Sequence, residues 1–251
     1  MLVAKRLTAI GFCAALTAVL HGAPVERVKP TSHTVLSLEG WTIHVDDRLL
    51  HDPNIELGRR AMRLLGNSLY EITLEMQADR LHRLQQIHIW LDLTHGQLTA
   101  AQYHPSPAWL SQHGYATNLA KCVHIPDAAL FASPRDHFRQ PWAVLHELAH
   151  AYHDQALGFD DPEIAAAWNR FKDCGRYDSA LQIDGRMEKH YGITNQKEFF
   201  AEMTEAYFGM NDFFPFNRAE LKREEPEVFR LLYRIWGPLP SPIASKVWSP
   251  S

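Results

Sequence analysis

The segment HELAH, residues 146–150, carries the clearest chemistry in the sequence. On a helix, His146 and His150 are four residues apart, so both imidazoles project from one face and can bind a single zinc ion. Glu147 lies beside them, where its carboxylate can take a proton from water that the metal activates. The pattern therefore predicts a catalytic zinc site with Glu147 as the general base.

A catalytic zinc site needs a third protein ligand, because such sites combine three protein donors with one open position. The best candidate is Glu198, at the start of EFFAE, where Phe199 and Phe200 indicate a helix that is buried on one side. Glu198 and Glu202 share a face of that helix at i, i+4 spacing. We expect Glu198 to bind the metal and Glu202 to accept the free ring N–H of a zinc-bound histidine.

His153 is an alternative third ligand, since it follows His146 and His150 on the same expected helix. A rise of about 1.5 Å per residue places His153 roughly 10 Å from His146 along the axis, too far for one ion with ligand bonds of about 2 Å. The metzincin pattern, which needs a third histidine soon after the motif, does not follow either. We expect His153 to be structural or to support a ligand, and we assign Asp154 no catalytic role.

Helical periodicity of apolar residues predicts the elements that position this chemistry. A long amphipathic helix is expected over 55–76. The helix of the motif is expected to begin at Gln140-Pro141, because a proline at an early helical position removes no hydrogen bond. Further helices are expected over 162–171, 196–208 and 226–236. The C-terminal half of the chain is therefore predicted to be mostly helical.

Alternation of apolar and polar residues predicts strands over 41–45, 86–93 and 121–125. Together with the long helix between them, the first two strands form a βαβ-like opening. The stretch 94–117 is rich in Gly, Pro, Ser, His and Gln and is expected to form loops. The strand over 121–125 could be an edge on which an extended peptide pairs.

Two tracts of the chain together resemble a known family. HELAH and HYGITNQKEFFAE, residues 190–202, look like the zinc-protease domain of anthrax lethal factor and the gluzincin metallopeptidases related to it. The resemblance implies a zincin-like α+β domain, with a small sheet over the active-site helix and a mainly helical C-terminal half. It also implies these site residues: metal ligands His146, His150 and Glu198, the base Glu147, and Glu202 in support.

The resemblance adds one residue that spacing alone does not identify. In the family, a tyrosine seven residues before the glutamate ligand polarises the substrate carbonyl or stabilises its oxyanion, and Tyr191 stands seven residues before Glu198. Tyr191 is therefore expected to be catalytic. Because the resemblance covers only the two tracts, it carries over the chemistry of the toxin domain and not its substrate or partners.

The composition bounds the class of protein but names no function. The 251 residues are 46% hydrophobic and 22% charged, as in ordinary soluble globular proteins, and one domain is expected over 24–251. A formal net charge of -4, without a long run of Lys and Arg, argues against nucleic acid as a partner. Most of the 15 histidines stand apart from the motifs and are expected to be solvated or structural; they include His33, His44, His51 and His104.

The first 23 residues have the pattern of a signal peptide. Basic residues precede an apolar stretch over 7–20, which is too short to span a bilayer comfortably, and the small residues Gly22 and Ala23 follow. We expect a secreted or periplasmic protein without stable membrane insertion after cleavage, an uncleaved anchor being the alternative.

Two cysteines remain after such a cleavage, Cys122 and Cys174. An even pair in an exported chain predicts a disulfide. Two unpaired thiols are the alternative, because sequence does not show whether the two Cα atoms come close enough to be bridged.

These features together predict a secreted metallopeptidase that uses one zinc ion to hydrolyse peptide bonds in a peptide or protein substrate. One alternative is a zinc-binding or interaction domain without catalysis. Glu147 disfavours it, since a structural site needs no carboxylate beside an open position and usually has four protein ligands. A zinc hydrolase acting on a non-peptide amide would use the same residues and stays open.

Overall fold

The computed structural model describes residues 27–240. Within them a five-stranded sheet has the order β1-β2-β3-β5-β4, in which β2, β3 and β5 are parallel and the two outer strands are antiparallel to their neighbours. Its strands are β1 (His33–Leu38), β2 (Trp41–Asp46), β3 (Ile89–Leu91), β4 (Gln102–Tyr103) and β5 (Val123–Ile125). A separate hairpin pairs β6 (Ala180–Leu181) with β7 (Met187–Glu188).

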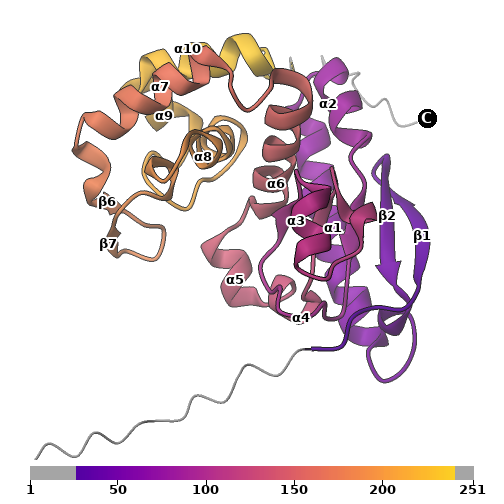
Figure 1. Cartoon of the computed structure of the whole chain (residues 1–251). Helices are drawn as coiled ribbons and strands as arrows, with labels where there is room; N and C mark the ends of the chain where they lie inside the picture. Colours follow the sequence, from indigo (N-terminus) through magenta and orange to yellow (C-terminus); the bar gives the residue numbers. More distant parts are fainter. Residues whose placement is uncertain (1–26, 241–251) are drawn as a thin grey trace, which may run out of the picture.

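Helices connect and cover the sheet and make up most of the C-terminal half (Figure 1). The N-terminal helices are α1 (Ile55–Glu75), α2 (Ala78–Gln85), α3 (Pro107–Gln112), α4 (Ala128–Phe131) and α5 (Pro134–Arg139). They are followed by α6 (Ala143–Tyr152), α7 (Pro162–Asp173), α8 (Gln196–Phe208), α9 (Arg218–Glu224) and α10 (Pro226–Trp236). The predicted α+β class is confirmed as a small mixed sheet with a mainly helical C-terminal half, and β2, α1, α2 and β3 form the expected βαβ-like opening.

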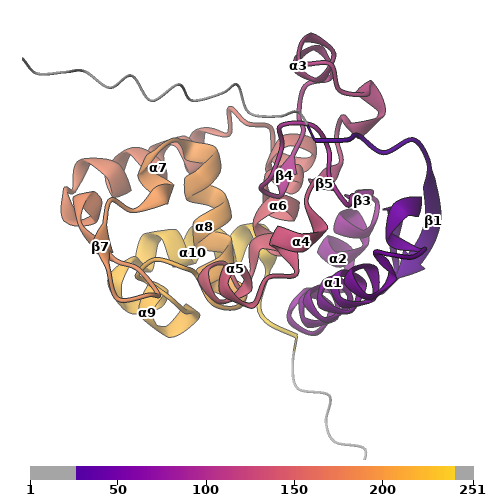
Figure 2. The same ribbon diagram turned by 90° about the horizontal axis from the view of Figure 1, so that it is seen from below.

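The helix α6 lies between the sheet and the C-terminal helices (Figures 1 and 2). It contacts β4 and β5 on one side and α8 on the other. Leu145, Leu148 and Ala149 are buried along it, and full burial of one leucine contributes about 2–3 kcal/mol. The main core therefore holds α6 from two sides, while its remaining face, with His146 and His150, is only partly buried.

The helix α8 is the most enclosed helix of the C-terminal half, with α7, α9 and α10 packed around it (Figure 2). It begins at a cap, where the side chain of Asn195 accepts the backbone N–H of Lys197 and of Glu198. Every residue from Phe199 to Phe208 is buried. Because α8 has little freedom to shift, Glu198 in its first turn has a well-defined position.

The stretch 94–117 was expected to form loops, but this is only partly right, because the stretch contains β4 and α3. A strand of two residues is too short to show an alternating pattern, so its pairing with β5 could not be read from sequence. This pairing also corrects the expectation that the strand over 121–125 is an edge. The edge strand is β4, which lies against α6.

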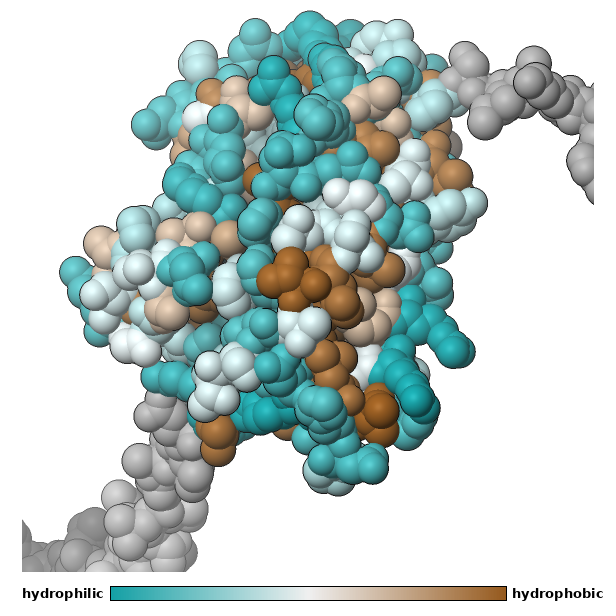
Figure 3. Space-filling view, turned by 90° about the vertical axis from the view of Figure 1, so that its right-hand side faces the viewer, coloured by the Kyte–Doolittle hydropathy of each residue, from teal (hydrophilic) through white to brown (hydrophobic). Residues whose placement is uncertain are grey.

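The opposite edge of the sheet is β1, which we did not predict. Its side chains are mostly exposed, and Val35 is 58% and Leu36 37% accessible. Figure 3 shows the side of the molecule on which β1 lies, where apolar side chains gather near the centre. A strand with so little burial has no need to alternate apolar and polar residues, and this explains why the pattern missed it.

The predicted disulfide is wrong, because Cys122 and Cys174 are both free. Cys122 packs beside Trp90 in a small cluster of buried residues that is separate from the main core. Cys174 is exposed at the C-terminal end of α7. The two thiols belong to different parts of the fold, so no bridge can join them without large backbone movements.

The predicted signal peptide lies outside the described residues. In the part of the chain that the structure describes, no helix combines the length and apolar character that crossing a membrane requires.

Candidate metal centre and catalytic cleft

His146, His150 and Glu198 converge on one point of the molecule. Oε2 of Glu198 lies 3.2 Å from Nε2 of His146 and 3.2 Å from Nε2 of His150. The ligand atoms of the three residues all lie within 4.8 Å of one another. Two imidazole nitrogens and one carboxylate oxygen form a donor set that zinc takes in catalytic sites, so the three predicted ligands come together and fit a metal ion.

The charges at this point favour a cation. Burial by itself would raise the pKa of Glu198, but the contacts with His146 and His150 outweigh it and lower that pKa well below its ordinary value. Burial likewise opposes a charge on His146, yet Glu198 and Glu205 raise its pKa well above the ordinary value. Glu198 is therefore ionised at neutral pH, and a bound metal would replace the proton that His146 otherwise holds.

Glu205, not the predicted Glu202, holds the second nitrogen of His146. Nδ1 of His146 lies 2.6 Å from Oε1 of Glu205 and 3.9 Å from Oε1 of Glu202. Glu205 follows Glu198 by seven residues, which is almost two full turns of a helix, whereas Glu202 follows it by four residues, slightly more than one turn. Glu205 is therefore more nearly in line with Glu198 on the helix face. This spacing is the signal in the sequence that could have identified Glu205.

Glu202 is instead part of a buried acidic group behind His146. It is 2% exposed, and its two oxygens lie 3.9 Å from Nδ1 of His146 and 3.9 Å from Nδ1 of His190. Burial, with Asp212 and Glu205 nearby, raises the pKa of Glu202 well above its ordinary value. Burial together with Glu205 raises the pKa of Asp212 to about 7. These shifts favour the protonated forms of Glu202 and Asp212, which lessens the repulsion between carboxyl groups held together inside the fold.

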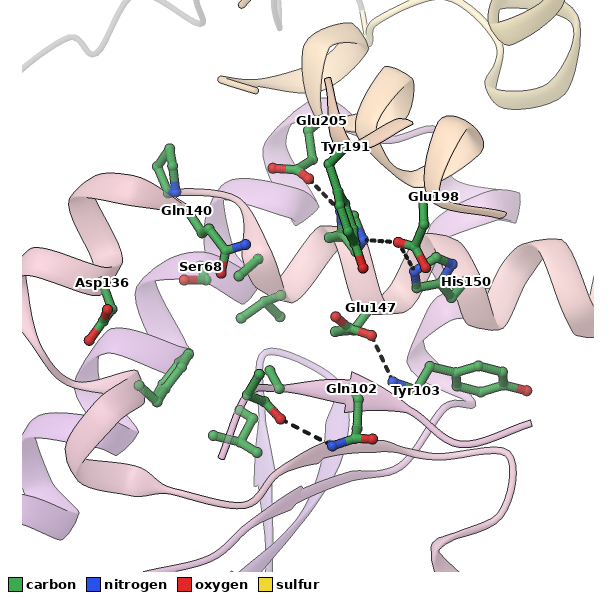
Figure 4. Close-up of a pocket in the computed structure, with 18 of the residues that line it drawn as sticks. Ser68, Gln102, Tyr103, Asp136, Gln140, Glu147, His150, Tyr191, Glu198 and Glu205 are labelled. Atoms are coloured by element: carbon green, nitrogen blue, oxygen red, sulfur yellow. Dashed lines mark hydrogen bonds and ion pairs between the residues drawn. The ribbon is translucent and has the colours of Figure 1, made fainter. Parts of the chain in front are cut away.

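Glu147 projects from α6 toward the edge strand β4 (Figure 4). Its Oε2 accepts the backbone N–H of Tyr103 at 2.7 Å, a contact that sequence reasoning missed because it depends on the short strand β4. Burial raises the pKa of Glu147 despite the two nearby imidazoles. A carboxylate with a raised pKa accepts and releases protons more readily near neutral pH, as a general base must.

Tyr191 lies beside the candidate metal ligands and lines the same cleft (Figure 4). Its ring centroid is 6.5 Å from that of His146, and the side chain is 47% exposed. A short 3₁₀ turn over Tyr191–Ile193 positions it, capped by His190, whose Nδ1 accepts the backbone N–H of Gly192 at 3.0 Å. Burial and the nearby charge of Glu198 raise the pKa of Tyr191, so its hydroxyl keeps the proton that it would donate.

The cleft has a volume of about 430 Å³ and is bounded by both halves of the molecule. Gln102 and Tyr103 of β4 lie on one side of it, and Tyr191 and Glu198 on the other (Figure 4). Apolar residues line it as well, among them Ala101, Ile125, Leu130, Phe131, Val144 and Phe159. The predicted ligands, base and tyrosine thus face one open space large enough for several atoms of a substrate.

His153 lies apart from the candidate metal ligands, as expected, and it belongs to none of the groups among the described residues that could hold a metal ion. It is fully buried in a π-helical turn that follows α6, with its ring 5.2 Å from that of Phe159 and 4.9 Å from that of Phe200. Burial lowers its pKa to about 4. Asp154, next to it, contacts the hydroxyl of Tyr103 at 2.6 Å and the ammonium group of Lys121, so its role is a local pairing.

Comparison of the chain with known protein families, with curated proteins and with solved structures finds no match.

Proposed function

We propose that the protein is a zinc metallopeptidase of the gluzincin type, with a zincin-like fold, that hydrolyses peptide bonds in a peptide or protein substrate. The observation that carries the proposal is the convergence of His146, His150 and Glu198 within 4.8 Å at the wall of an open cleft, with Glu147 on the same helix. Export, which the pattern of residues 1–23 predicts, is part of the proposal.

The chain supplies the acid and base chemistry. A zinc ion held by His146, His150 and Glu198 supplies Lewis acidity, which polarises a carbonyl and lowers the pKa of water. Glu147 takes a proton from the attacking water and delivers it to the leaving amine. The hydrogen bond from the backbone of Tyr103 keeps this carboxylate at the cleft, and its raised pKa suits both transfers.

Tyr191 is the second catalytic group of the proposal. Its hydroxyl donates a hydrogen bond to the oxyanion that develops on the substrate carbonyl, where a preorganised donor is most effective. An extended substrate would lie along β4, whose position at the edge of the sheet and beside the cleft suits pairing with a peptide backbone.

A purely structural centre is a weaker interpretation of the same residues. Structural zinc sites have four protein ligands and are closed. Here three donors line an open cleft, and the carboxylate of Glu147 lies beside them. The cleft thus supports catalysis over a role in folding alone.

The test combines metal analysis with activity on a library of quenched fluorogenic peptides. Glu147→Gln should keep its zinc and lose kcat/KM by about 10²- to 10⁴-fold, the usual contribution of a general base. His150→Ala should lose both one equivalent of zinc and the activity. Glu71→Gln, at an exposed position of α1, is the matched control and should behave like the unaltered protein. Unchanged turnover in Glu147→Gln, or the absence of peptide cleavage by the zinc-loaded protein, would refute the proposal.

A further inference from the structure

A second group of histidines surrounds a carboxylate on the face of the sheet opposite α6. His124 is the middle residue of β5, and successive side chains of a strand point to opposite faces. Val123 and Ile125 pack into the main core, so His124 points away from it. On that far face His124 meets Asp92, which directly follows β3 and is fully buried.

Three imidazoles contact the single carboxylate of Asp92. Its Oδ2 lies 2.6 Å from Nδ1 of His95 and 2.7 Å from Nε2 of His124. Its Oδ1 lies 2.7 Å from Nε2 of His33, which belongs to β1. The ligand atoms of Asp92, His95 and His124 all lie within 4.8 Å of one another, and the three residues are buried.

This donor set matches what zinc and related ions bind. Imidazole and carboxylate groups are their common protein ligands. A histidine that binds a metal almost always donates its other ring N–H to an acceptor. Nδ1 of His124 has such a neighbour, because Nε2 of His104 lies 3.1 Å away and His104 is itself buried.

The site also has a route by which an ion can enter. A cavity of about 340 Å³ lies next to the group and is lined in part by His33, Trp90 and His95. It is distinct from the catalytic cleft, with which it shares no lining residue.

We propose that Asp92, His95 and His124 bind a second transition-metal ion of the zinc class, with His33 fixing the outer oxygen of the carboxylate. The ion joins the end of β3 to β5. Through the contact of His124 with His104, it also holds the residue that directly follows β4. Since Tyr103 of β4 holds the base Glu147, the second ion stabilises the edge strand at which the catalytic cleft is built.

The test is the metal content of the full chain and of single variants, measured by mass spectrometry after loading with zinc and removal of the excess. The unaltered protein should hold two equivalents. Asp92→Asn and His95→Gln should each hold one, and His150→Ala should also hold one. His82→Gln, at an exposed histidine of α2, is the control and should hold two.

The single variants separate this inference from the proposed function. If His150→Ala keeps all the metal while Asp92→Asn and His95→Gln lose it, the second site stands and the proposed catalytic centre fails. If Asp92→Asn and His95→Gln keep all the metal, the inference is overturned, and the cluster is a hydrogen-bonded network alone. Should neither of these two variants fold, cobalt titration of His150→Ala decides. Saturation at one equivalent supports the second site, and no binding overturns it.

Discussion

At the scale of single residues, His146 is held by carboxylates on both of its ring nitrogens. Glu198 lies at Nε2 and Glu205 at Nδ1. If Nε2 binds a metal as proposed, the N–H at Nδ1 would donate to Glu205, and this would fix the tautomer and the orientation of the ring. In the proposed site, helix α8 would thus provide one carboxylate that binds the metal and, almost two turns later, a second that orients the histidine.

The two candidate orienting residues can be separated by experiment. Glu205→Gln should weaken zinc binding by about 10- to 100-fold, as is typical when a partner of a metal-bound histidine is altered. Glu202→Gln should weaken zinc binding less, since Glu202 lies 3.9 Å from Nδ1 of His146 and burial raises its pKa well above the ordinary value, which favours its neutral form. Competition against a chelator of known affinity measures both. A larger loss in Glu202→Gln would reverse the assignment.

Tyr191 can be tested without disturbing the metal. Tyr191→Phe removes only a hydroxyl, so zinc content and KM should stay nearly constant while kcat falls by about 10²-fold or more. Tyr233→Phe is the control, because Tyr233 has the same exposure, 47%, and lies on α10 outside the cleft. Steady-state kinetics that give normal turnover for Tyr191→Phe would remove this residue from the mechanism.

At the scale of elements, the candidate metal centre depends on the fit between α6 and α8. His146 and His150 come from α6, and Glu198 and Glu205 from α8. The ring of Trp142, directly before α6, lies so close to Gly209, directly after α8, that a Cβ atom at position 209 would be 1.9 Å from the ring. Glycine at this position therefore lets the end of α8 approach the beginning of α6.

A methyl group at position 209 should force the two helices apart. Gly209→Ala is expected to lower the free energy of unfolding by about 1–3 kcal/mol, as overpacking commonly does, and to weaken zinc binding at the same time. Gly66→Ala in α1 is the matched control, because its nearest neighbour would be a methyl carbon of Leu38 at 3.5 Å. That change should be neutral or stabilising.

Denaturant titration at a fixed concentration of free zinc measures both glycine variants, since bound metal contributes to apparent stability. Equal stability and equal zinc affinity for Gly209→Ala and the unaltered protein would contradict the expected effect on the α6–α8 contact.

At the scale of the whole molecule, several histidines are buried in a neutral form. Burial lowers the pKa of His104 to about 3, that of His153 to about 4 and that of His190 to about 3. In the unfolded chain each has an ordinary pKa of about 6.5. Below pH 6.5 the unfolded state therefore binds more protons than the folded state, and stability falls as the pH falls.

The contribution of these buried neutral histidines to the free energy of unfolding is complete above pH 6.5, and it is lost progressively as the pH falls toward 3–4. His153→Phe should reduce the slope in this window, because phenylalanine cannot take up a proton, and the site between Phe159 and Phe200 suits an apolar ring. It should leave the zinc content unchanged. Urea unfolding between pH 7 and pH 4.5 measures the slope, with exposed His82→Gln as control. An equal slope for His153→Phe and the unaltered protein would contradict the assignment of a buried neutral imidazole.

The sequence by itself determined the features that depend on near neighbours in the chain. Apolar residues at helical spacing predicted α1, α7, α8 and α10 to within a few residues of their observed ends. The motif helix began at Ala143, two residues after Pro141. The pairing of His146 with His150 could be read in the same way, because four residues apart on a helix is a local relation.

Only the tertiary structure decided the relations between distant segments. It placed Glu205 rather than Glu202 against the second ring nitrogen of His146. It also made β4 rather than β5 the edge of the sheet and left Cys122 without a disulfide partner. It further brought His33 and His124 to Asp92 and His95, although these two histidines stand in segments far from Asp92 and without a shared pattern. The physical reason is that local periodicity reports which face of an element is buried, whereas contacts between elements depend on how those faces pack.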